Sequence, residues 1–197
     1  MWQISLTISV IYKDLDDFEN AKEYFKKALE IDNKIYGPNH PEVATNVKNL
    51  GDVLRAQGEL ENAREYYKRA LQIEETFYGL DNPNIAATAS DLGSVLKDMG
   101  NLEDAKRLYE RALEIDQKVY GPDHPSVAKE FSNLGDIHKA LGNFEKAKTY
   151  FEKALSIDEK VYGPHHPRTT STKIKLDSLL EDTNSLDGQS TEIKFKF

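Results

Sequence analysis

The stretch Gly121-Pro122-Asp123-His124-Pro125 decides the fold, because three close copies of it recur along the chain. The copies are Gly37-Pro38-Asn39-His40-Pro41, Gly79-Leu80-Asp81-Asn82-Pro83 and Gly163-Pro164-His165-His166-Pro167, each 42 residues from the next. A fixed period of this length is the signature of a small supersecondary unit that is stacked several times. The chain is therefore expected to be a repeat array.

Each repeat contains two helical segments, as the third copy shows. From Pro83 to Met99 apolar residues fall three or four positions apart, as on one face of a helix, and Gly100-Asn101 ends this segment. The same spacing resumes at Leu102 and continues to Gly121. Glycine can end a helix in the left-handed conformation, and the second proline of each copy suits the first turn of the next helix. The histidines of the recurring stretch are expected near the N-cap of that next helix: His40, His124 and His166.

The expected fold class is all-α, an α-solenoid of four stacked antiparallel helical hairpins followed by a C-terminal capping helix. The array is expected to span residues 1–182, with repeats at about 1–37, 41–79, 83–121 and 125–163 and the capping helix at 167–182. Residues 183–197 are expected to form a polar, flexible tail. Glycines in the middle of the first helices predict close helix packing, and we expect alanines of the second helices to face them: Ala63, Ala105 and Ala147.

Composition excludes several classes of protein. The net charge of −8 argues against a general affinity for nucleic acid or anionic membranes, because both need a basic surface. The absence of cysteine excludes disulfides, thiol catalysis and cysteine-based zinc sites. No apolar run approaches the roughly 20 residues that span a bilayer. We therefore expect a protein of the cytoplasm.

No segment of the sequence carries a catalytic signature. There is no glycine-rich phosphate loop, nucleophile elbow or His-Glu-x-x-His segment. The recurring histidines are expected about 10 Å apart in stacked helices, too far for one zinc ion. We expect a protein that is not an enzyme and that has no catalytic residue, cofactor or metal.

The residues inside each hairpin resemble a known family. Leu50-Gly51 in a first helix, followed by Ala63, Tyr67 and Ala70 in the second, resembles the tetratricopeptide repeat. The 42-residue version with Gly-Pro-Asp-His-Pro is similar to the repeats of kinesin light chains. The resemblance covers residues 8 to about 180 and implies a right-handed superhelix whose first helices line a concave groove. It also implies a cytosolic adaptor role, although the sequence contains no heptad coiled coil for a motor heavy chain.

The positions that face the groove in such repeats form the candidate peptide-binding site. They are Lys13, Thr45, Lys48, Asn49, Asp52, Arg55, Ser90, Asp91, Ser94, Lys97, Lys129, Ser132, Asn133, Asp136 and Lys139. One repeat position is basic in every copy and predicts a ladder that holds acidic side chains: Lys13, Arg55, Lys97 and Lys139. The alternative is a solvated helix face. A clamp for a C-terminal carboxylate is disfavoured, because Asp52 and Asp136 would repel it.

The favoured hypothesis is a non-catalytic scaffold that binds an extended, partly acidic segment of another protein, without nucleic acid or membrane partners. A first alternative is a structural module that self-associates through the apolar residues at one end of the array, Trp2, Ile4 and Ile8. A second is a regulatory repeat appendage of a longer protein.

Overall fold

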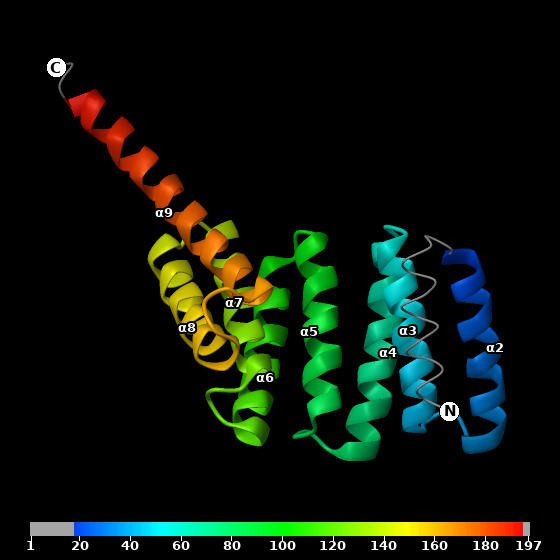
Figure 1. Cartoon of the computed structure of the whole chain (residues 1–197). Helices are drawn as coiled ribbons and strands as arrows, with labels where there is room; N and C mark the ends of the chain where they lie inside the picture. Colours follow the sequence, from blue (N-terminus) through cyan, green and yellow to red (C-terminus); the bar gives the residue numbers. More distant parts are fainter. Residues whose placement is uncertain (1–17, 195–197) are drawn as a thin grey trace. The chain divides into compact units, whose positions relative to one another are not determined.

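The structure is a computed structural model that describes residues 18–194 and the side chains of residues 18–183. This part of the chain contains eight helices and no strand (Figure 1). The helices are α2 (Phe18–Tyr36), α3 (Pro41–Ala56), α4 (Leu60–Tyr78), α5 (Pro83–Asp98), α6 (Leu102–Tyr120), α7 (Pro125–Ala140), α8 (Phe144–Tyr162) and α9 (Pro167–Lys194). The expected all-α fold class is confirmed.

The chain divides within α6 into two compact units, Met1–Leu108 and Tyr109–Phe197. In the first unit α3 and α4 form a helical hairpin, with α2 packed against α3 and α5 against α4. In the second unit α7 and α8 form the corresponding hairpin, and α9 packs against α8. Each hairpin joins a helix of 16 residues to one of 19 residues. The segment in which we expect the first helix of repeat one lies at residues 1–17, outside the described residues.

The recurring stretch places each helix end as its residues predict. Gly121 has a φ of +86°, in the left-handed region that glycine adopts without strain, and it follows the last residue of α6. His124 then caps α7, because its Nδ1 accepts a hydrogen bond of 3.2 Å from the backbone N–H of Ser126. His40 and His166 make the same bond with Glu42 and Arg168. The expected N-cap position of these histidines is confirmed.

Replacing His124 with alanine is expected to lower the free energy of unfolding by about 1 kcal/mol, the usual cost of losing an N-cap acceptor. The substitution also removes the stacking of this imidazole on Tyr120, whose ring centroid lies 4.2 Å away. His124→Asn should retain most of the stability, because Asn82 already caps α5 through its own side-chain oxygen at 2.9 Å. Urea denaturation followed by circular dichroism measures both variants. Equal stability of the wild type and the alanine variant would contradict the cap.

The core of each hairpin is built around one aromatic ring from the second helix. Tyr67 in α4 and Phe151 in α8 are buried, and a fully buried ring of this size contributes about 1.5–3 kcal/mol. The Tyr67 ring lies against Gly51 of α3, and the Phe151 ring lies against Gly135 of α7. Close packing at these glycines is therefore confirmed. The expectation that alanines would face them was wrong, because the aromatic rings are the nearest groups to both glycines.

The last helix is longer than its sequence suggested. We expected a capping helix that ends at residue 182, whereas α9 continues to Lys194 and includes most of the segment expected to be a flexible tail. The first part of α9 packs on α8, with Leu179 buried against Ala147 and Phe151. The polar composition of residues 183–194 disfavours burial, but it does not prevent a helix from continuing.

Candidate functional site

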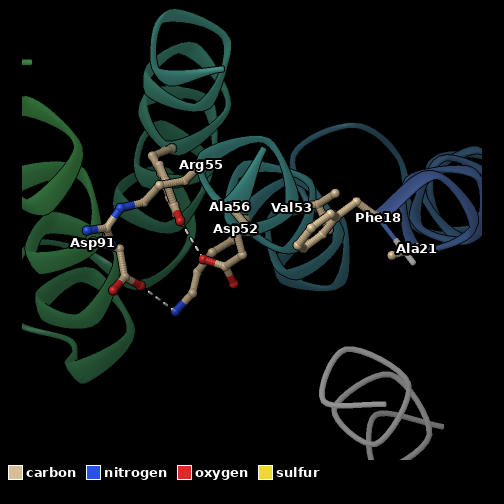
Figure 2. Close-up of a pocket in the computed structure, with 9 residues that line it drawn as sticks. Phe18, Ala21, Asp52, Val53, Arg55, Ala56 and Asp91 are labelled. Carbon is tan, nitrogen blue, oxygen red and sulfur yellow. Dashed lines mark hydrogen bonds and ion pairs between the residues drawn. The ribbon is translucent and has the colours of Figure 1, made fainter. Parts of the chain in front are cut away.

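A groove of the first unit lies beside the first helices and has a volume of about 610 Å³. It is lined by Phe18, Ala21, Lys48, Asp52, Val53, Arg55, Ala56, Tyr67 and Asp91. Figure 2 shows Arg55 and Asp91 on one side of this groove and Phe18, Ala21 and Val53 on the other. The groove therefore has a charged wall and an apolar wall.

Lys48 lies at the centre of the charged wall, between two aspartates. Its Nζ is 3.2 Å from Asp91 of α5, and Asp52 follows it by one turn of α3. Burial by itself would lower the pKa of Lys48, but Asp91 and Asp52 outweigh burial and raise it above the usual value. Asp52 also accepts a hydrogen bond from the hydroxyl of Tyr67. Burial, followed by the charge of Asp52, raises the pKa of that hydroxyl far above its usual value. Lys48 is therefore a fixed cation in the charged wall of the groove.

Arg55 lies one helical turn beyond Asp52 and is bound to the neighbouring repeat. Its Nε and Nη2 donate to Oδ2 of Asp98 at 3.1 and 2.8 Å. The two side chains are about one third exposed, at 35% and 36%. The ion pair therefore links α3 to α5 at the solvent-facing edge of the groove.

The second unit contains a smaller and more polar groove of about 240 Å³. It is lined by Lys129, Ser132, Asn133, Asp158, Arg168, Ser171, Thr172 and Lys175. Lys175 of α9 donates to Ser132 at 2.9 Å and to Asp136 at 2.7 Å. Arg168 lies 2.8 Å from the buried carboxylate of Asp158. Both grooves thus hold cations that are paired with carboxylates of the same unit.

The structure brings together only part of the predicted site. The first groove collects Lys48, Asp52, Arg55 and Asp91, and the second collects Lys129, Ser132 and Asn133. Three predicted hydroxyl residues do not line either groove: Thr45, Ser90 and Ser94. The hydroxyls of Thr45 and Ser94 donate to backbone carbonyls one turn earlier in their own helices. Lys13 lies outside the described residues, as do Trp2, Ile4 and Ile8.

The remaining predicted positions are divided between the two units, each of which holds part of the basic ladder. Lys97 is a partly exposed residue in the last turn of α5. Lys139 of α7 donates to Ser178 at 3.1 Å and lies 2.8 Å from Asp182 of α9. The amide of Asn133 donates to Glu130 of its own helix at 3.1 Å. In the described residues, Arg55 and Lys139 are thus both bound to acids.

Sequence reasoning missed the partners of these cations. Asp98, Asp182 and Lys175 were not predicted, yet each makes an ion pair with a predicted residue. The 42-residue register could have found Lys175, because it places Lys175 at the position of Asn49 and Asn133. It was overlooked because α9 was interpreted as a cap, whose surface was not expected to continue the groove.

One position of the second helices is acidic in every repeat, at Asp32, Glu74, Asp116 and Asp158. Asp32 accepts a hydrogen bond from Asn46 at 2.6 Å, and Asp158 accepts one from Thr172 at 2.9 Å. Burial raises the pKa of Glu74 to about 7 and raises that of Asp116 in the same direction. The column joins each second helix to the following first helix, so these acids have a role in packing.

The part of the chain that the structure describes has neither a metal-binding cluster nor a membrane-spanning helix. No group of three or more histidine, aspartate or glutamate side chains there is arranged to hold a metal ion. Among the helices from α2 to α9, none combines the length and the apolar character that crossing a bilayer requires.

The family model for the tetratricopeptide repeat matches residues 3–76, 45–118, 84–160 and 131–176. No curated protein matches the chain. BtubC (BKLC) from P. vanneervenii is a similar solved structure, with a TM-score of 0.81 and 21% identity over 89% of this chain and 70% of that one. A putative kinesin light chain of Podosopora anserina with nearly identical TPR-like repeats has a TM-score of 0.79 and 18% identity over 98% and 91% of the chains.

Proposed function

Because the chain belongs to the tetratricopeptide repeat family, we propose that it is a non-catalytic scaffold that binds an extended, partly acidic segment of another protein. The observation that carries the proposal is the groove of the first unit, which is lined by the cations Lys48 and Arg55 and by the apolar residues Phe18 and Val53. A peptide in extended conformation alternates its side chains, so it can present carboxylates to one wall and apolar groups to the other. The proposal includes an adaptor role in the cytosol, as the resemblance to kinesin light chains implies.

The cations of the first unit supply the attraction for acidic side chains. Lys48 stays protonated because two aspartates raise its pKa. Arg55 lies about two turns further on along α3, and Lys97 lies in the last turn of α5. Positive charges at the edge of a groove steer an acidic ligand and weaken as salt screens them. The same charges provide little for a neutral ligand, so the proposal predicts a preference for acidic over neutral peptides.

Reversing two of these charges, with Arg55→Glu and Lys97→Glu, is expected to weaken binding of an acidic peptide about tenfold or more, because attraction becomes repulsion. The probe is a fluorescein-labelled peptide of alternating glutamate and serine, measured by fluorescence anisotropy across a series of salt concentrations. The variant should also show a flatter salt dependence than the wild type. The matched control is Lys68→Glu with Arg69→Glu, which makes the same change in net charge on the exposed face of α4. The proposal fails if both double variants bind the peptide as the wild type does.

A further inference from the structure

The two basic ladder residues whose ion pairs the structure describes are bound in the same way in separate units. Arg55 of α3 is bound by Asp98 of α5, and Lys139 of α7 is bound by Asp182 of α9. In both cases the acid lies 43 residues after the cation, one residue beyond the repeat period. The contact is therefore a recurring feature of how one first helix faces the next.

Both ion pairs lie where an entering ligand can reach them. The side chains of Arg55 and Asp98 are 35% and 36% exposed, and those of Lys139 and Asp182 are 33% and 51% exposed. Exposed ion pairs contribute little to stability, because water and salt compete with the attraction. A second carboxylate can thus replace the internal one at small cost.

The sequence shows that the acid is not a requirement of the repeat. The position that Asp98 and Asp182 occupy is held by Ala56 in the second repeat and by Ala140 in the fourth. Alanine at this position is compatible with the same first helix, since α3 and α7 are each 16 residues long, as is α5, which ends in Asp98. The acid is therefore not needed for the helix to fold, and its role lies in the ion pair with the cation.

We propose that Asp98 and Asp182 are internal competitors of the ligand, each of which occupies the cation that a ligand carboxylate would take. This inference rests on the proposed function. When the ligand binds, its carboxylates replace the aspartate carboxylates at Arg55 and Lys139, so that no unpaired cation is involved. Such exchange favours ligands with several carboxylates, because one acidic group gains little over the aspartate that it displaces.

The test is Asp98→Asn, which keeps the size of the side chain and removes its charge. The variant is expected to bind the glutamate–serine peptide about two- to fivefold more tightly than the wild type, in line with the small cost of breaking an exposed ion pair. In an Arg55→Gln background the same substitution should give no gain, because the shared cation is absent. Glu61→Gln is the matched control, since it removes one negative charge from the exposed first turn of α4.

The outcomes separate this inference from the proposed function. If Arg55→Gln weakens binding but Asp98→Asn behaves as Glu61→Gln does, the competitor role is overturned and the acidic groove stands. If Asp98→Asn loses affinity and also unfolds at a lower temperature than the wild type, the competitor role is overturned as well, because Asp98 would then stabilise the structure of the groove. If neither the wild type nor Asp98→Asn prefers the glutamate–serine peptide to its glutamine–serine counterpart, both proposals fall.

Discussion

Replacing Glu74 with glutamine is expected to stabilise the protein by up to about 3 kcal/mol at about pH 8 and to leave its stability nearly unchanged at about pH 4. Glu74 is buried, and burial raises its pKa from 4.5 to about 7, with Lys48 opposing the shift and Asp91 adding to it. A carboxyl group in this position is more easily protonated in the folded than in the unfolded chain. Its contribution to stability is therefore complete below pH 4.5 and is lost as the pH rises through 7.

Glutamine cannot ionise, so the variant should lack this loss between pH 4.5 and 7. Urea denaturation at a series of pH values measures the difference between the two proteins. Glu61→Gln controls for the removal of one negative charge, because it lies at the exposed start of the same helix. If the stability of the wild type and of the Glu74 variant changes with pH in the same way, ionisation of the buried Glu74 carboxyl does not destabilise the protein.

Replacing Gly135 with alanine is expected to destabilise the second unit by about 1–3 kcal/mol, the usual cost of adding a methyl group to a filled core. The added carbon would lie 2.5 Å from an atom of the Phe151 ring, and that ring is completely buried, so the clash can be relieved only by displacing groups of the core. The gain in helix propensity, about 1 kcal/mol, is too small to offset a clash of this size. Thermal and urea unfolding, followed by circular dichroism, measure the loss.

The same substitution at Gly51 is the matched control. Its added carbon would lie 3.2 Å from the Tyr67 ring, a contact that small shifts can relieve, so the propensity gain should bring Gly51→Ala close to the wild type. Combining Gly135→Ala with Phe151→Leu should recover part of the loss, because leucine leaves room for the methyl group. If both alanine variants are equally stable, the close approach of Phe151 to α7 does not determine how the protein tolerates a methyl group at Gly135.

The two glycines also show why pattern reasoning found the contact but not its partner. A glycine that recurs in the middle of a helix indicates that something approaches closely. Tyr67 and Phe151 follow each glycine by 16 residues, and Ala63 and Ala147 by 12, so the spacing alone favours neither. The rotation of the second helix about its own axis decides, and it turns the ring towards the glycine.

The sequence indicated which residues lie near one another in the candidate site, but it did not indicate which of their charges are already paired. The register drew attention to Lys48, Asp52, Arg55 and Asp91, and the structure places these four residues along one groove. From the register we expected the basic ladder to be available to a ligand, whereas Arg55 is bound by an aspartate of the next repeat. Periodicity identifies residues that share a position in every repeat, but an ion pair joins two different positions.

By itself the sequence determined the repeat, the helix starts and the capping histidines, because these depend on contacts within a few residues of the chain. Tertiary structure alone decided which side chains of neighbouring first helices meet. That choice depends on the offset between packed helices, which sets Arg55 against Asp98, 43 positions later, instead of against its own repeat equivalent 42 positions later. An offset of one residue turns a ladder of like charges into ion pairs, since it moves the contact by about 100° around the helix.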